Sequence, residues 1–186
     1  MSFRFLKLNI PDVILTEPVS HIDLRGYFLE VFKSSSFSQN GIEFRFSQDN
    51  LSFSKRGTVR GLHYQKHPYE QGKLVYTITG SIFDVAVDLR INSETFGRYV
   101  YANLSEENHR SLWIPSGFGH GFMALEDSHV LYKVTNEYNK DYESGIVWND
   151  PDIGVKWPFI QPIISNKDRK LISFKQYKKE MGTISE

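Results

Sequence analysis

The chain has 186 residues, with 22 Lys and Arg balanced by 22 Asp and Glu, and no cysteine. A chain of this length fits one domain that buries roughly 70% of the surface its unfolded form would expose, and its zero net charge excludes general nucleic-acid binding. Without cysteine, disulfides and thiolate metal ligands are excluded.

The first residues do not resemble a secretory signal, because charged and polar residues interrupt the apolar ones between Phe3 and Ile10. No apolar run in the chain approaches the length of a membrane span. We therefore expect a cytoplasmic protein with neither a membrane nor a nucleic acid as partner.

The early part of the chain favours strands over helices. Phe, Tyr and Trp make up 15% of the residues, and such large rings are typical of half-buried strands. The segment "ILTEPVSHIDLRGYFLEVF" (14–32) is predicted to be an early strand. After it, "SSSFSQNG" (34–41) predicts a short turn of helix that ends at Gly41.

Polar residues gather on the next strands. Gln48 and Asn50 lie two apart and point the same way, "VRGLHYQ" (59–65) carries Arg60 and His63, and Lys73 opens the following strand. A single polar strand residue is most often only solvated. Several of them on neighbouring strands indicate an interior face that binds a charged ligand.

The middle of the chain predicts a run of strands. Residues 73–90 predict an antiparallel hairpin with its turn at Gly80 and Ser81. In "SIFDVAVDLR" (81–90) one face is apolar and the other is polar at three of four positions. Further strands are predicted at 97–104, 110–115, 121–125 and 129–138. This spacing with few helices is typical of an all-β sandwich or barrel.

The carboxy-terminal region has a different pattern. From about residue 150 the strands give way to an irregular region, and "SNKDRKLISF" (165–174) begins with the Ser-x-x-Asp pattern of a capping box. Residues 1–186 are therefore predicted to form one all-β domain with short peripheral helices.

Pro115, Gly117 and His120 have the P-x-G-x-x-H spacing of the second cupin motif. A metal-binding cupin needs three or four protein donors, usually including an H-x-H pair on an earlier strand. His63 has no such neighbour, since His67 lies four residues on, roughly 13 Å along an extended strand. We predict no metal site, and we expect the histidines to transfer protons or form hydrogen bonds.

An ordered set of motifs between about residues 10 and 171 resembles the dTDP-4-dehydrorhamnose 3,5-epimerase family. The motifs are "FSQDNLSFSKRGTVRGLHYQ", "QGKLVYTITGSIFDVAVDLRINSETFG", "LWIPSGFGHGFMAL", "YKVTNEY" and "ISNKD". The resemblance implies a cupin jelly roll, that is, a double-stranded β-helix. It also implies a homodimer in which an amino-terminal segment of one subunit completes the sheet and site of the other.

The activity implied by the resemblance is the inversion of carbons 3 and 5 of dTDP-4-dehydro-6-deoxy-D-glucose. The product is dTDP-4-dehydro-L-rhamnose, an intermediate in dTDP-L-rhamnose biosynthesis. Both carbons neighbour the 4-keto group, so loss of either proton gives an enolate. The reaction needs a base, an acid on the opposite face and a cation near the carbonyl oxygen, but no metal or redox cofactor.

By resemblance, His63 is the base and Asp168 the carboxylate that orients it. The residues alone favour a capping box with Ser165 as the role of Asp168. Tyr132 matches the proton donor, although a strand tyrosine is more commonly a packed aromatic. Tyr138, six residues on and on the same side if the strand continues, is the competing acid.

Lys73 matches the cation near the carbonyl oxygen, and His120 matches a contact to the sugar or enolate. The other substrate-binding positions implied by the resemblance are Arg25, Glu30, Gln48, Asp49, Asn50, Arg60, Tyr138, Glu143 and Lys167. Arg60 suits a diphosphate because guanidinium donates paired hydrogen bonds. Since Arg60 and His63 would face opposite ways on an ideal strand, we predict a bulge or bend between them, which Gly61 permits.

The loop "EDSH" (126–129) is one residue shorter than the family pattern. We place the gap in the turn, which keeps Tyr132 in its motif position. If the gap lies inside the strand instead, the acid becomes Tyr138.

Three other functions remain open from the sequence. One is an epimerase that inverts a single carbon of another nucleotide-linked 4-keto sugar. The second is a metal-dependent cupin enzyme, and the third is a carbohydrate-binding jelly roll without activity.

Overall fold

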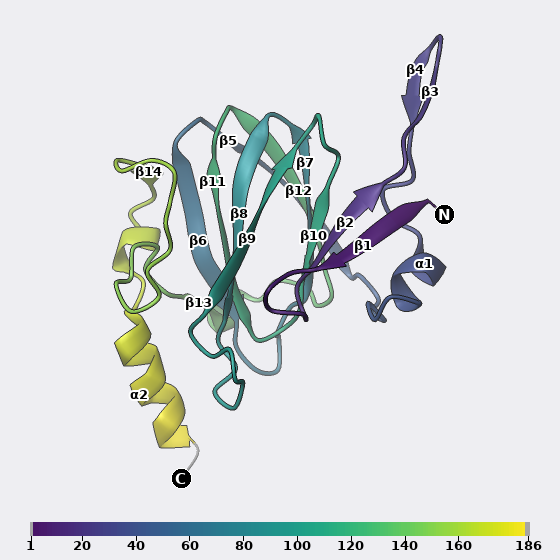
Figure 1. The fold of residues 1–186 in the computed structure, drawn as a ribbon. Helices are drawn as coiled ribbons and strands as arrows, with labels where there is room; N and C mark the ends of the chain where they lie inside the picture. Colours follow the sequence, from purple (N-terminus) through teal and green to yellow (C-terminus); the bar gives the residue numbers. More distant parts are fainter. Residues whose placement is uncertain (1, 185–186) are drawn as a thin grey trace.

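Two mainly antiparallel sheets packed face to face form the body of the computed structural model, which describes residues 2–184 (Figure 1). Residues 1, 185 and 186, which belong to the predicted domain, lie outside the described residues. Sheet I has the order β1-β2-β10-β7-β12-β5, formed by Phe3–Lys7, Ile14–Pro18, Ser111–Ile114, Lys73–Thr79, Ser128–Val134 and Gln48–Ser54. Sheet II has the order β13-β6-β11-β8-β9, formed by Glu143–Gly145, Thr58–Gln65, Phe118–Ala124, Ser81–Asp88 and Tyr99–Ser105, and β14 (Ile163–Ile164) pairs with β6.

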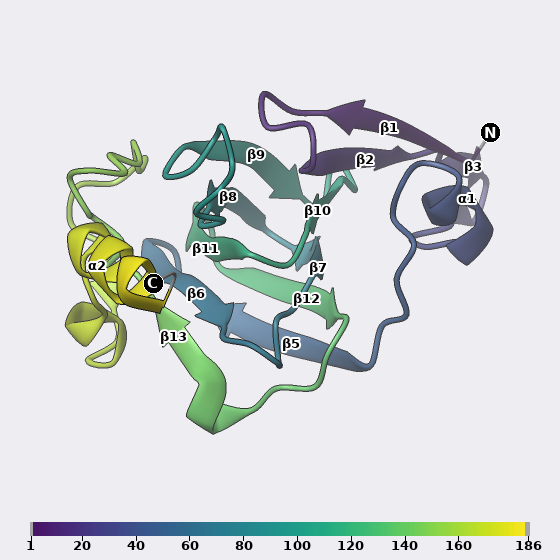
Figure 2. The ribbon, with the colours of Figure 1, turned by 90° about the horizontal axis from the view of Figure 1, so that it is seen from below.

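The remaining elements are peripheral. β3 (His21–Asp23) and β4 (Gly26–Phe28) form a separate hairpin. The helices are α1 (Ser34–Ser38), the short 3-10 helices η1 (Lys140–Tyr142) and η2 (Asp168–Lys170), and α2 (Phe174–Ile184). Figure 2 looks along the barrel and shows α1 and α2 outside it, on opposite sides. The predicted all-β jelly roll with short peripheral helices is confirmed.

Three apolar clusters hold these layers together. An inner cluster between the sheets includes Val75 and Ala86, and a second cluster between sheet II and the carboxy-terminal segment includes Phe83 and Val85. A third cluster, around Phe37, covers the outer face of sheet I. The alternation predicted for β8 is therefore confirmed, and both faces of this strand are buried.

The predicted hairpin across 73–90 is wrong. β7 lies in sheet I between β10 and β12, whereas β8 lies in sheet II between β11 and β9. The chain crosses between the sheets at Gly80, which has a φ of +75° and whose Cβ, if present, would lie 2.4 Å from the carbonyl oxygen of Asp127. Alternation shows which faces are buried but not which strand is the neighbour, so the local pattern does not reveal the crossing.

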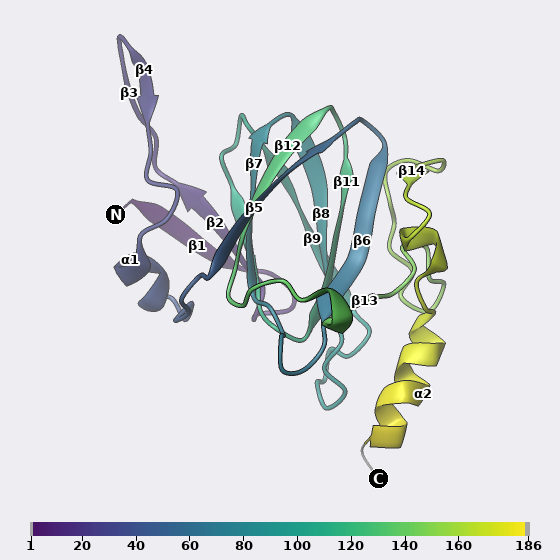
Figure 3. The same ribbon diagram turned by 180° about the vertical axis from the view of Figure 1, so that it is seen from behind.

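Three other predicted elements have different bounds in the structure. The early segment 14–32 divides into β2 and the β3–β4 hairpin, which projects from the body with Arg25 in its turn (Figures 1 and 3). β12 ends at Val134, four residues before Tyr138. In the region 165–174 the helical part is limited to η2 and the first residue of α2, Phe174.

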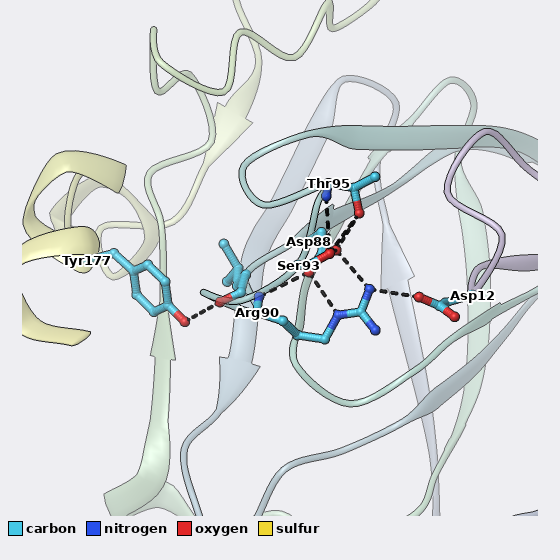
Figure 4. Close-up of polar contacts among 7 residues, drawn as sticks. Asp12, Asp88, Arg90, Ser93, Thr95 and Tyr177 are labelled. Atoms are coloured by element: carbon cyan, nitrogen blue, oxygen red, sulfur yellow. Dashed lines mark hydrogen bonds and ion pairs between the residues drawn. The ribbon is translucent and has the colours of Figure 1, made fainter. Parts of the chain in front are cut away.

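A buried aspartate ties together three segments at one end of the barrel (Figure 4). The side chain of Asp88 is fully buried and accepts hydrogen bonds from the Arg90 backbone and guanidinium, from Ser93 and from Thr95. Arg90 also binds Asp12 in the β1–β2 loop, at 2.7 Å. Tyr177 of α2 donates to the carbonyl oxygen of Leu89 in the same loop, at 2.7 Å. Asp88 is thus the anchor of the loop that follows β8.

Asp88→Asn is expected to lower the free energy of unfolding at pH 7 by about 2 kcal/mol. Burial acts to raise the pKa of Asp88, but its bonds to Arg90, Ser93 and Thr95 outweigh burial and lower the pKa from 3.8 to about 2. This stabilisation is present above pH 4 and is lost as the pH falls towards 2. Urea denaturation at pH 7 and pH 3 measures it, and the variant should lose less stability on acidification than the wild type.

Asp12→Asn is the matched control, because it removes a carboxylate that binds the same guanidinium but is 53% exposed. An exposed ion pair contributes only about 0 to 1 kcal/mol. Equal destabilisation by the two variants would contradict the role assigned to Asp88.

Candidate functional site

A cavity of about 670 Å³ lies between the two sheets and is lined by all four of the predicted catalytic residues. Its lining includes His63, Lys73, His120, Tyr132, Arg60 and Asp168. A smaller cavity of about 300 Å³ shares His63, Lys73, Tyr132 and Glu143 with it and adds Gln48, Asn50 and Tyr138. Residues that are far apart in the sequence therefore meet in two cavities that share part of their lining.

A bulge in β6 turns Arg60 and His63 into the same cavity. His120 of β11 pairs with His63 and Phe122 pairs with Arg60, so the three residues 120–122 of β11 oppose the four residues 60–63 of β6. Gly61 lies in this bulge with a φ of +127°, and a Cβ there would lie 2.5 Å from the Cα of Gly121. Only glycine fits this close approach of two backbones. The predicted bulge or bend between Arg60 and His63 is confirmed, and it is a bulge at Gly61.

His63 and Asp168 form a hydrogen-bonded pair. His63 Nε2 lies 2.8 Å from Asp168 Oδ1, and the backbone N–H of Gly61 donates to Asp168 Oδ2 at 3.3 Å. The Asp168 side chain is only 5% exposed, whereas the imidazole is 28% exposed. Burial acts to raise the pKa of Asp168, but the bonds from His63 and Gly61 outweigh it and lower the pKa. The carboxylate is therefore held ionised beside the ring.

The capping interaction predicted for Ser165 is present in one direction. The Asp168 backbone N–H donates to Ser165 Oγ at 3.0 Å, as in a capping box. The reciprocal bond is replaced, because the Asp168 carboxylate turns to His63 and Gly61. One residue thus satisfies both of the roles considered for it.

Lys73 is a buried residue of the cavity lining. It is 8% exposed, and its ammonium donates to the His63 carbonyl oxygen at 3.4 Å. Burial lowers the pKa of Lys73 to about 8, although the charges of Asp84 and Glu143 oppose this effect. At neutral pH Lys73 is a cation in a nearly dry pocket, where its field acts strongly on any developing negative charge.

His120 is also buried and is paired with a residue that the sequence prediction missed. Its Nε2 lies 2.7 Å from Asp84 Oδ1, and Asp84 is fully buried. Burial lowers the pKa of His120 despite the charge of Asp84, which favours a neutral ring at pH 7. The signal for Asp84 was its charge on the inner face of the predicted strand 81–90.

Tyr132 faces the cavity from sheet I, across from His63 on sheet II. Its Cα partners are Asn50 on β5 and Val75 on β7, and the pairing with β7 shifts only between His129 and Val130. The irregularity therefore lies before Tyr132, on the turn side of the strand. Burial raises the pKa of Tyr132, so the phenol keeps its proton at neutral pH.

Tyr138 has a different environment. It lies beyond the end of β12, so the expectation that it continues the same strand is wrong. It is 48% exposed and lines only the smaller cavity. Its hydroxyl donates to Glu143 at 2.5 Å, and this bond raises the pKa of Tyr138 to about 12. Lys167 also forms an ion pair with Glu143.

The hydroxyl of Ser52, which lines the larger cavity, is buried without a hydrogen bond to another described residue. The Oδ2 atom of Asp84 is also buried and unpaired, although Asp84 does not line the cavity and reaches it only through its bond to His120. Leaving such groups unsatisfied costs about 1–3 kcal/mol each, and a polar ligand would reduce this cost. Ser52 and Lys55, which also lines the cavity, were not predicted as site residues.

Three predicted binding residues lie outside the two cavities that contain His63. Arg25 is in the turn of the β3–β4 hairpin and pairs with Asp23. Glu30 follows the hairpin, and its carboxylate lies 3.7 Å from the Lys33 ammonium. Asp49 alternates with the inward-facing Gln48 and Asn50, so it points out of sheet I. There it forms an ion pair with Lys133.

Within residues 2–184, no three His, Cys, Asp or Glu side chains gather in a group that could hold a metal ion. In the same range, no helix is long and apolar enough to cross a membrane.

Comparisons with known proteins point to one family. Residues 7–176 match the dTDP-4-dehydrorhamnose 3,5-epimerase family. The dTDP-4-dehydrorhamnose 3,5-epimerase of Methanothermobacter thermautotrophicus is 52% identical, covering 90% of this chain and 92% of the relative. The crystal structure of the Sulfolobus tokodaii enzyme is 49% identical with a TM-score of 0.88, covering 95% of this chain and 97% of that one.

Two solved structures of similar proteins contain sugar nucleotides. The Legionella pneumophila epimerase in complex with dTDP-4-keto-L-rhamnose is 40% identical with a TM-score of 0.92, covering 96% of each chain. A 3′-monoepimerase from Streptomyces bikiniensis in complex with dTDP-quinovose is 34% identical with a TM-score of 0.86, covering 94% of this chain and 89% of that one.

Proposed function

Because the chain belongs to the dTDP-4-dehydrorhamnose 3,5-epimerase family, we propose that it inverts carbons 3 and 5 of dTDP-4-dehydro-6-deoxy-D-glucose to give dTDP-4-dehydro-L-rhamnose. The observation that carries the proposal is a single cavity in which the His63–Asp168 pair faces Tyr132, with Lys73 beside them. These groups are the base, the acid and the cation that proton transfer next to a ketone requires.

His63 is the proposed base. Asp168 engages Nε2 of its ring, which leaves Nδ1 to take a proton from the carbon next to the ketone. The Asp168 carboxylate then stabilises the imidazolium that forms. Tyr132, on the opposite sheet, is the proposed acid that protonates the other face of the enolate.

Lys73 and His120 are proposed to hold the carbonyl oxygen and the sugar. The ammonium of Lys73 balances the charge of the enolate oxygen, and a neutral His120, fixed by Asp84, offers a hydrogen-bonding ring nitrogen. Neither role requires a metal or a redox cofactor, because the 4-keto group itself delocalises the charge.

Activity is expected to fall above pH 8, because Lys73 then loses its proton. Its pKa of about 8 means that the cation is present below this pH and absent above it. The profile of kcat/KM against pH should therefore have an alkaline limb near pH 8. Lys73→Arg keeps the cation and should move this limb to higher pH, at a reduced maximum rate. The surface variant Lys170→Arg is the control, and an unmoved limb in Lys73→Arg would assign the titration to another group.

The nucleotide half of the substrate is proposed to occupy the part of the larger cavity that is lined by Arg60 and Lys167, together with the smaller cavity. Arg60 and Lys167 offer cationic donors for the diphosphate at the larger cavity. Gln48, Asn50, Tyr138 and Glu143 offer polar groups and an aromatic ring to the nucleoside in the smaller cavity.

We propose that the protein is a homodimer in which Arg25, Glu30 and Asp49 act across the interface. The β3–β4 hairpin projects from the body (Figure 3) and exposes Leu24 and Phe28. Leu51 and Phe53 are exposed on the outer face of β5, an edge strand of sheet I. Apolar residues at such positions favour burial against a second copy. Light scattering during gel filtration would decide, since a monomer mass contradicts the proposal.

The decisive experiment is incubation with dTDP-4-dehydro-6-deoxy-D-glucose in heavy water. The expected result is deuterium at both carbon 3 and carbon 5, with inverted product detected by NMR. No label at either carbon would exclude an epimerase and leave a binding protein. A metal analysis of the same sample tests the cupin metalloenzyme alternative.

A single-carbon epimerase is the second candidate. The similarity to a 3′-monoepimerase supports it, because base, acid and anion contacts would be alike in both reactions. Deuterium at one carbon alone would favour this candidate. We also propose a cytoplasmic location, because a charged nucleotide sugar does not cross a lipid bilayer unaided.

A further inference from the structure

The position of Asp168 depends on a short turn that begins at Ser165. The preceding strand β14 pairs in parallel with the start of β6, with Ile163 opposite Thr58 and Ile164 opposite Val59. After this pairing the chain turns away from β6 at Ser165, and it comes back to β6 at Asp168, the first residue of η2. The turn therefore sets where the carboxylate meets the bulge of β6.

Ser165 holds this turn through two hydrogen bonds. Its hydroxyl accepts from the Asp168 N–H at 3.0 Å, and its carbonyl oxygen accepts from the Arg169 N–H at 3.1 Å. Asp168 is 4% exposed, so water cannot readily replace the hydroxyl as a partner for its N–H. Removing the hydroxyl leaves this buried donor unsatisfied unless the turn shifts.

A shift of the turn would act directly on the His63–Asp168 pair. The carboxylate has two fixed partners on β6, the His63 ring at 2.8 Å and the Gly61 N–H at 3.3 Å. Both bonds require the Asp168 backbone to stay in place. A displaced carboxylate no longer fixes the ring orientation and tautomer that proton abstraction needs.

We propose that the Ser165 hydroxyl is a positioning residue for the His63–Asp168 pair. The inference rests on the proposed function, since it concerns the same base. Ser165 acts through Asp168, and its effect is on the chemical step more than on substrate binding. The neighbouring Lys167 reaches Glu143 through a long flexible side chain, which tolerates a small shift of the turn.

Ser165→Ala is expected to lower kcat by about 10-fold or more while KM changes little. Ser165→Thr keeps the hydroxyl and should restore kcat to near the wild-type value. Steady-state kinetics and the rate of deuterium exchange into substrate measure these effects, and circular dichroism with thermal unfolding verifies the fold.

Ser173→Ala is the matched control. The Ser173 hydroxyl accepts from the Gln176 N–H at 3.2 Å at the start of α2, so this variant removes the same kind of cap away from the cavity. A loss of stability similar to that of Ser165→Ala, with kcat unchanged, is expected. If Ser165→Ala does not fold, Ser165→Cys replaces it, and kcat between those of the wild type and a dead enzyme is expected because sulfur is a weaker acceptor.

A folded Ser165→Ala or Ser165→Cys enzyme with wild-type kcat would overturn the inference. So would a failure of Ser165→Thr to recover activity, or an equal loss of kcat in Ser173→Ala. Failure of the proposed function is distinguished from these outcomes, because the wild-type protein would then show no exchange in the same assay.

Discussion

His63→Ala is expected to abolish deuterium exchange at both carbon 3 and carbon 5. The imidazole paired with Asp168 is the proposed base for both positions, so its loss stops enolate formation at each. General base catalysis contributes about 10²- to 10⁴-fold, and a rate reduction of this size is expected. NMR of dTDP-4-dehydro-6-deoxy-D-glucose in heavy water measures the two exchange rates separately.

Two other histidines serve as controls for this prediction. His67 is exposed and binds Glu70, and His67→Ala should leave both exchange rates unchanged. His120 lies in the cavity with Asp84, and His120→Ala should slow exchange without abolishing it. Substantial exchange in His63→Ala would mean that another group is the base. Loss of exchange at only one carbon would mean that the two carbons use different bases.

The part of the site built on β6 could be predicted because its constraint is local. Two functional side chains three residues apart need an extra residue between them, and Gly61 alone among the intervening residues accepts a positive φ. The structure places Gly61 in that bulge, and Arg60 and His63 line one cavity. Gln48 and Asn50 follow in the same way from a period of two, and Gln48 Nε2 donates to Asn50 Oδ1 at 2.7 Å.

Strand partners could not be predicted from alternation. β7 and β8 have the pattern of a hairpin, but each strand is buried on both faces by partners from other parts of the chain. The same non-local packing buries Asp84 next to His120, two residues 36 positions apart. Nothing in the sequence near Asp84 distinguishes it from Asp88, which anchors a loop instead.

Asp168 shows how a local rule and a distant contact can act on one residue. The capping pattern correctly located the bond from its N–H to Ser165, and the family resemblance pointed to its carboxylate as the partner of His63. The local rule alone would have returned the carboxylate to the start of the turn. Only the fold, which brings η2 against β6, gives it a partner 105 residues away.

Tyr132→Phe is expected to impair inversion far more than exchange. The variant lacks only the hydroxyl, so His63 still removes a proton and the enolate still forms. The enolate then regains a deuteron from the base on the original face, which labels the substrate without inverting it. We expect inversion to fall by about 10²- to 10⁴-fold while exchange falls much less. NMR distinguishes labelled substrate from inverted product.

Tyr138→Phe separates the two tyrosines. Tyr138 is half exposed and its hydroxyl already donates to Glu143, both of which make it a poor donor to a buried enolate. This variant should raise KM through the smaller cavity and leave the ratio of inversion to exchange as in the wild type. If Tyr138→Phe lowered that ratio and Tyr132→Phe did not, the acid would be Tyr138. We expect instead that only Tyr132→Phe lowers the ratio of inversion to exchange. Tyr132 lines the same cavity as His63, and its raised pKa means that the phenol is protonated there at neutral pH.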